Sequence, residues 1–104
     1  MSNLTTNNQN LLAQLTAETR RTMIEAGQFN DFVLKLGFLP VWEECELGRT
    51  KMPRVTIRIT TVNCEFELMY MYSGFWSLTE LNTSWQIEDA SIEMVMSEVV
   101  RLLN

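Results

Sequence analysis

Few side chains in this chain could do chemistry, because its 104 residues include no histidine and only two cysteines. The predicted strand register places one pair of carboxylates together, Glu67 and Glu80, and paired acids can share a proton and act in acid–base catalysis. The same register places Arg58 beside Glu67. A salt-linked structural row therefore explains these residues better than a catalytic pair does.

The other candidates each lack a requirement of the chemistry they suggest. Glu43, Glu44 and Glu46 could offer oxygen ligands to a divalent ion, but their spacing does not match an EF-hand loop. Cys45 and Cys64 form no Cys-x-x-Cys pair and have no histidine partner, so we expect two reduced thiols rather than a zinc site or a nucleophile. We therefore expect no catalytic activity, no metal and no cofactor.

The charge is unevenly distributed along the chain. The formal net charge is −5, and from Glu65 onward seven acidic residues stand against Arg101 alone. Such a surface disfavours direct binding to the phosphate backbone of nucleic acid and suits a protein partner with a basic surface. The simpler interpretation is a solvated acidic surface that keeps a small protein soluble.

The stretch from Arg54 to Leu81 contains Arg58, Glu67 and Glu80, and its sequence pattern predicts three antiparallel strands. The runs from Arg54 to Thr61 and from Cys64 to Tyr72 both alternate between apolar and other residues. A loop over Thr61–Cys64, with Asn63 in the left-handed conformation, joins them and fixes the register. The predicted pairs are Ile59 with Phe66, Ile57 with Leu68, Val55 with Tyr70 and Arg58 with Glu67.

A second turn at Ser73-Gly74 predicts a third strand from Phe75 to Leu81. Counting from this turn pairs Trp76 with Met71, Leu78 with Met69, and Glu80 with Glu67. The predicted core face then contains Phe66, Leu68, Tyr70, Tyr72, Phe75 and Leu81. The opposite face would contain our candidate partner-binding residues, which are Arg54, Glu67, Met69, Met71, Trp76, Leu78 and Glu80.

Large apolar side chains on this second face need a cover. One interpretation is an interface to a second copy of the chain or to a protein target, because aromatic, Met and Arg side chains are enriched at interface centres. The other interpretation is that the helix from Leu11 to Ala26 lies across this face inside the monomer, which would give a three-layer arrangement.

Helices are predicted at both ends of the chain. Residues 1–10 are rich in Asn and Thr and predict a flexible tail. A helix follows from Leu11, either broken at Gly27 before a second short helix that ends at Gly37, or continuous and bent. A last helix begins near Ile92, with Asp89 or Ser91 as its cap. Its apolar stripe consists of Ile92, Val95, Met96, Val99, Leu102 and Leu103.

These elements predict an α+β, two-layer fold: an N-terminal helix, an antiparallel meander of three to four strands and a C-terminal helix. Val41 to Leu47 is the expected edge strand, joined to the meander through a loop from Gly48 to Pro53. Residues 82–87 could add a short extended piece. Residues 11–104 form one domain. No run approaches the roughly 20 apolar residues of a membrane span, so we expect a cytoplasmic protein that does not bind membranes.

Two classes of function fit these features. The first is a non-catalytic, acidic protein-binding module, most concretely a phage-type inhibitor of the anti-CRISPR kind that blocks the basic surface of a nucleic-acid-handling protein. The second is a small acidic dimeric chaperone or adaptor that holds a partner segment on its sheet or hydrophobic face. Ionic strength separates them, because a charge-based complex weakens steeply in salt and a hydrophobic clamp does not.

Overall fold

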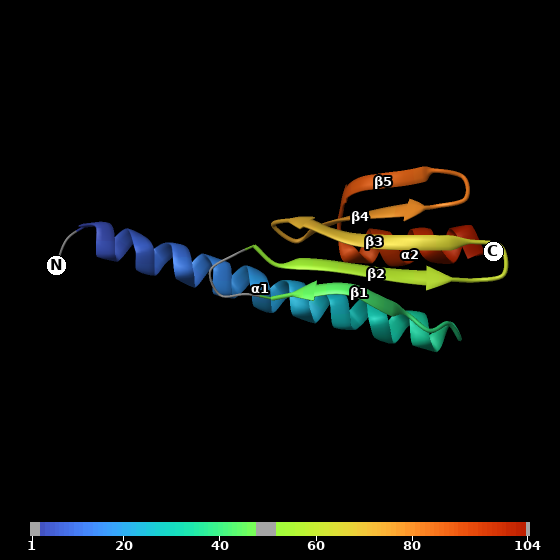
Figure 1. Ribbon diagram of the computed structural model, residues 1–104, viewed down its shortest axis with the longest axis horizontal. Helices are drawn as coiled ribbons and strands as arrows, with labels where there is room; N and C mark the ends of the chain where they lie inside the picture. Colours follow the sequence, from blue (N-terminus) through green and yellow to red (C-terminus); the bar gives the residue numbers. More distant parts are fainter. Residues whose placement is uncertain (1–2, 48–51, 104) are drawn as a thin grey trace.

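The computed structural model describes residues 3–47 and 52–103, with side chains from Thr16 onward. Its elements are α1 (Asn3–Lys35), β1 (Val41–Glu46), β2 (Arg54–Thr60), β3 (Glu65–Tyr72), β4 (Phe75–Glu80), β5 (Trp85–Ala90) and α2 (Ile92–Leu103). The strands form one antiparallel sheet in the order β1-β2-β3-β4-β5 (Figure 1). The predicted α+β two-layer fold is confirmed, with one strand more than expected.

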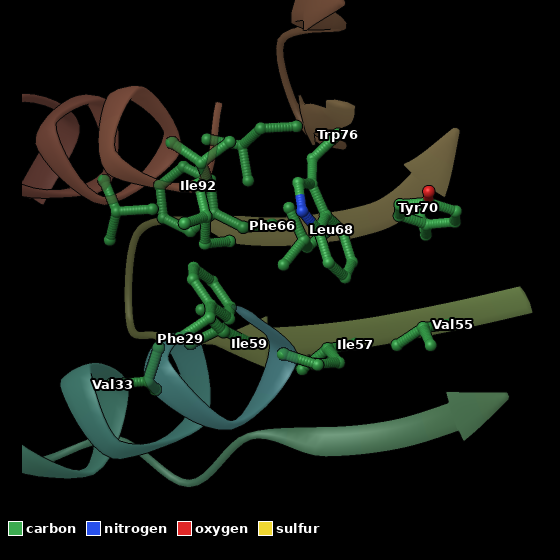
Figure 2. Close-up of a cluster of buried hydrophobic side chains, with 14 of the residues drawn as sticks. Phe29, Val33, Val55, Ile57, Ile59, Phe66, Leu68, Tyr70, Trp76 and Ile92 are labelled. Atoms are coloured by element: carbon green, nitrogen blue, oxygen red, sulfur yellow. The ribbon is translucent and has the colours of Figure 1, made fainter. Parts of the chain in front are cut away.

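Both helices pack on the same face of the sheet. Figure 2 shows Phe29 and Val33 of α1 and Ile92 of α2 around one cluster with side chains of β2, β3 and β4. All three residues are fully buried, as are Ile57, Phe66 and Leu68 of the strands. The alternative of a three-layer arrangement is therefore wrong, because α1 and α2 share one layer and neither helix covers the other face of the sheet.

Helix α1 is continuous through Gly27, so of the two alternatives left open by the sequence, a break there or one helix, the second is correct. The reason is packing: Thr22, Ala26, Phe29 and Val33 recur at helical spacing and are all buried, and their burial outweighs the roughly 1 kcal/mol that a helix-interior glycine costs. The helix also takes in residues 3–10, which the sequence predicts as a tail.

Helix α1 ends where the sequence predicts, at Gly37. The amide of Phe38 donates to the Val33 carbonyl at 3.1 Å, and the amide of Gly37 donates to the Leu34 carbonyl at 3.0 Å. Gly37 has a φ of 94°, so this is a Schellman cap, in which glycine takes the left-handed position.

The first hairpin has the register counted from the sequence. Ile57 pairs with Leu68, Arg58 with Glu67, and Ile59 with Phe66. The expected four-residue loop also forms, closed by a hydrogen bond of 2.8 Å from the Thr61 amide to the Cys64 carbonyl. The left-handed conformation expected for Asn63 is wrong, since Ser73, Ser84 and Asp89 are the described non-glycine residues with positive φ.

The second hairpin has the predicted turn but not the predicted register. Ser73 and Gly74 have φ values of 48° and 84°, as a two-residue hairpin turn requires, and Tyr72 pairs with Phe75. A bulge then follows, because Tyr70 rather than Met71 lies opposite Trp76. Because of this one extra residue in β3, each β4 side chain after the turn points to the opposite face of the sheet from the one predicted.

Strands β1 and β5 form the two edges of the sheet, and helix α2 follows β5. Strand β1 pairs with β2 as predicted, and residues 48–51 of the loop between them lie outside the described part of the chain. The extended piece expected at residues 82–87 overlaps strand β5, which begins only at Trp85 and pairs with β4. The Ser91 hydroxyl accepts a hydrogen bond of 3.2 Å from the Met94 amide, so Ser91 is the N-cap of α2.

The molecule is elongated, with extents of 59 × 22 × 20 Å. A helix of 33 residues is about 50 Å long at 1.5 Å per residue, which is longer than the strands. The N-terminal part of α1 therefore extends past the hairpin that joins β3 and β4, as Figure 1 shows at the end marked N.

Candidate protein-interaction face

We call the side of the sheet turned away from the helices the open face. Its side chains alternate along each strand with those of the core, and the strand pairing aligns them in rows across the sheet. One row consists of Val41, Arg58, Glu67, Thr79 and Gln86. The next consists of Glu44, Thr56, Met69 and Ser77.

Arg58 is the centre of an ionic cluster on the open face. Its guanidinium lies 2.9 Å from a carboxylate oxygen of Glu43, 3.4 Å from one of Glu65 and 3.1 Å from one of Glu67. The hydrogen bond to Glu67 is the main reason that the pKa of Arg58 is raised above its ordinary value. Three carboxylates around one cation leave the cluster with net negative charge, so it can still attract a basic group.

Acidic side chains predominate over the whole open face. Arg54 lies 2.9 Å from Glu44, while Glu88 accepts a hydrogen bond from Gln86 and Asp89 accepts one from Tyr72. The acids of this face are Glu43, Glu44, Glu46, Glu65, Glu67, Glu88 and Asp89, and its bases are Arg54 and Arg58.

The helical layer has nearly balanced charge by comparison. Its acids are Glu18, Glu25, Asp31, Glu93 and Glu98, and its bases are Arg20, Arg21, Lys35 and Arg101. Among the residues that the structure describes, the open face therefore carries most of the excess negative charge.

Exposed apolar side chains also lie on the open face beside the acids, among them Val41, Met69, Tyr72 and Phe75. Met69 is 44% exposed, Tyr72 46% and Phe75 39%. The rings of Tyr72 and Phe75 meet edge to face with centroids 5.9 Å apart, and the Tyr72 hydroxyl donates to Asp89 at 2.9 Å. Paired aromatic rings that are held in place but exposed lose little conformational entropy when a partner covers them.

The structure divides the candidate partner-binding residues between the two faces of the sheet. Arg54, Glu67 and Met69 lie on the open face, as predicted, and Met71 is half-buried in the bulge of β3. The placement of Trp76, Leu78 and Glu80 on this face is wrong. These three residues are 0%, 0% and 4% exposed and face the helices.

Burial of Trp76 and Leu78 explains the shift in register. Trp76 meets Tyr70 edge to face at 5.1 Å, and its indole N–H donates to Glu25 of α1 at 3.1 Å. Leu78 lies opposite Leu68 in the core. Burying a large apolar side chain contributes about 1.5–3 kcal/mol. The bulge buries Trp76 and Leu78 completely, whereas the side chains that it turns outward, Tyr72, Phe75 and Leu81, still have more than half of their surface covered.

The same shift moves three residues out of the predicted core. Tyr72, Phe75 and Leu81 are 46%, 39% and 38% exposed, where the sequence predicts core positions. Tyr72 and Phe75 are thus the interface candidates that sequence reasoning missed. Tyr72 and Phe75 pair across the Ser73-Gly74 turn, so their side chains must lie on the same face of the sheet. Which face that is depends on the bulge.

Glu80 and Glu67 do not form a carboxylate pair. Glu67 lies opposite Thr79, whereas Glu80 lies opposite Phe66 on the other face. Each oxygen of the Glu80 carboxylate accepts a backbone amide, one from Glu65 at 2.8 Å and one from Thr83 at 2.9 Å. The amide of Glu65 is the main reason that the pKa of Glu80 is lowered. Glu80 therefore stays ionised and holds strand ends together.

The described residues contain no group of three His, Cys, Asp or Glu side chains arranged to hold a metal ion. Cys45 is exposed, Cys64 is half-buried, and both thiols are free. Within the part of the chain that the structure describes, neither helix is both long enough and apolar enough to cross a membrane. Comparison with known proteins yields no relative: no family model matches the chain, and no curated protein or solved structure matches it significantly.

Proposed function

We propose that this protein is a non-catalytic protein-binding module whose open face binds the basic surface of a protein partner. The most specific form of the proposal is an inhibitor of a nucleic-acid-handling protein, which would place carboxylates where that protein otherwise binds phosphates. The segregation of acidic side chains onto the one sheet face that no helix covers carries this proposal.

The arrangement of the open face supports a specific rather than a diffuse contact. The Arg58 cluster fixes Glu43, Glu65 and Glu67 at 2.9–3.4 Å from one guanidinium, so their positions are set before a partner arrives. Met69, Tyr72 and Phe75 add apolar surface next to them. Apolar side chains bordered by fixed charges are the common anatomy of protein interfaces.

A second candidate is a chaperone or adaptor that holds an extended segment of its partner. The observation that favours it is the open sheet, because β1 and β5 each have one partner strand and leave an edge to which another strand can pair. Binding of this kind depends on backbone hydrogen bonds and apolar contacts, so its affinity depends little on salt.

Two measurements on the partner test the proposal. A protein captured from a host lysate is purified, and its affinity for this chain is measured from about 0.05 to about 0.5 M salt, where screening of exposed charges becomes strong. We expect the affinity to fall steeply with salt. We also expect DNA or RNA to displace the chain from its partner.

A matched pair of variants locates the contact. E65Q/E67Q neutralises two acids of the Arg58 cluster, and E93Q/E98Q neutralises two acids of α2, one of which binds Arg101. We expect E65Q/E67Q to weaken binding about tenfold, which is about 1.4 kcal/mol, and E93Q/E98Q to change it less than about twofold. Equal effects of the two variants, or an affinity that does not depend on salt, would contradict the inhibitor proposal.

A further inference from the structure

An apolar pocket opens at the end of the molecule where the β2–β3 loop meets both helices. It has a volume of about 230 Å³ and is lined by Phe38, Thr61, Asn63, Cys64, Leu102 and Leu103, together with Val62. Figure 1 shows this end at the label C, opposite the N-terminus. Since one water occupies about 30 Å³ in the liquid, the pocket has room for a branched aliphatic side chain.

Val62 projects from the rim of this pocket. It is 99% exposed, which is more than any other large apolar residue whose side chain the structure describes. Loop tips are normally Asn, Asp, Gly or Ser, because these residues satisfy the backbone and face water without cost. A fully exposed valine at the tip of a hairpin therefore contributes nothing to the fold of the monomer and is suited to a contact with another molecule.

The charge of this end differs from that of the open face. The residues that line the pocket carry no ionisable group except the thiol of Cys64, whereas the open face carries most of the excess negative charge of the described residues. Two copies of an acidic protein repel each other wherever their acidic faces meet. A contact through this end therefore avoids bringing the acidic open faces of two copies together.

We propose that two copies associate through these ends, with Val62 of each copy in the apolar pocket of the other. A two-fold axis close to the loop accounts for both features at once, because an isologous contact needs a projection and a matching hollow on the same surface. The pocket supplies the hollow, and Val62 supplies the projection at its rim. This contact does not involve the open face.

The size of the end limits the strength of the contact. The two shorter extents of the molecule, 22 and 20 Å, restrict a flat end contact to roughly 440 Å² per copy, about half of the ~800 Å² of a standard interface. We therefore expect a weak dimer, with a dissociation constant of roughly 0.1–1 mM. We also expect its greatest dimension to approach twice the 59 Å length of the monomer.

Sedimentation equilibrium and small-angle X-ray scattering over a concentration series test this proposal on the full chain. The wild-type protein should pass from monomer to an elongated dimer as its concentration rises. V62D places a carboxylate at the contact and should raise the dissociation constant at least tenfold. V62T keeps the side-chain shape with one polar atom and should have a smaller effect in the same direction.

Controls separate this contact from other modes of association. M23D introduces the same charge at a 59% exposed position of α1 and should leave the dimer unchanged. Circular dichroism melting of V62D and V62T should match the wild type, because Val62 buries nothing in the monomer. A wild-type protein that stays monomeric at about 1 mM, or a dimer that V62D and V62T weaken no more than M23D does, would overturn the proposal.

Discussion

At the scale of single residues, Glu80 is a buried carboxylate with a structural role. Its oxygens accept the amides of Glu65 and Thr83, and the Leu81 amide donates to the Glu65 carbonyl at 2.7 Å. These bonds join the start of β3 to the turn after β4. A carboxylate that accepts backbone amides is stabilised in its charged form, which is why the pKa of Glu80 is lowered.

We predict that Glu80→Gln destabilises the protein at neutral pH and that this effect disappears in acid. A carboxyl group whose pKa is lower in the folded state than in the unfolded chain stabilises the fold above its ordinary pKa of 4.5, and it loses that contribution as pH falls through the lower, folded value. Glutamine does not titrate. Melting temperatures of both proteins should therefore differ at pH 7 and converge only as the pH falls below the lowered, folded-state pKa of Glu80.

A constant difference between the two proteins across this pH range would contradict the role given to the Glu80 carboxylate. Asp31→Asn is the control, since Asp31 is exposed within α1. It should show little difference from the wild type at any pH.

At the scale of elements, two glycines have different backbone conformations: Gly27 is helical, and Gly74 has a positive φ. Gly27 is inside α1, and a Cβ added there would meet nothing within 4 Å. Gly74 has a φ of 84°, and a Cβ there would lie 3.1 Å from Nε of Arg21. Helix packing keeps α1 continuous despite Gly27, whereas the β3–β4 turn requires glycine at position 74.

We predict that Gly27→Ala stabilises the protein by up to about 1 kcal/mol, because alanine is the better helix former and its methyl group fits the space. Gly74→Ala should destabilise by about 1 kcal/mol or more, because alanine is strained at positive φ and crowds Arg21. Urea unfolding of both variants measures these differences. A loss of stability in Gly27→Ala would mean that α1 is not helical through this position in solution.

At the scale of the whole molecule, one face of the sheet packs against both helices and neither helix covers the other face. Both helices cover the face with Ile57, Leu68 and Leu78, which are fully buried. The open face carries the Arg58 cluster and exposed Met69. Association through the open face and association through the Val62 end involve different surfaces, so one molecule could do both at once.

Leu78→Glu and Met69→Glu together test this division of the two faces. Leu78→Glu buries a charge under the helices and should cost at least about 4 kcal/mol in the monomer. Met69→Glu changes an exposed residue and should alter the free energy of unfolding by less than about 0.5 kcal/mol. Urea unfolding in dilute solution measures both changes. Similar effects of the two substitutions would contradict the placement of Leu78 on the face that the helices cover.

The sequence by itself determined the features that depend on local periodicity. The register of β2 against β3 follows from the alternation of Val55, Ile57 and Ile59, since a slip of one residue would expose all three. The ends of the helices at Gly37 and Ser91 follow from capping chemistry, which acts within a few residues. The Arg58 and Glu67 pair of the open face followed from the same register count.

Only the tertiary structure decided the features that depend on how much apolar surface is buried between residues far apart in the sequence. The bulge at Met71 leaves no mark in the local pattern of β3. It is favoured because it places Trp76 against Tyr70 and within 3.1 Å of Glu25 on α1, a helix far away in the sequence. The continuity of α1 through Gly27 has the same cause, because Ala26 and Phe29 pack on the sheet. For this reason the sequence predicted Arg54, Glu67 and Met69 on the open face correctly and misplaced Trp76, Leu78 and Glu80.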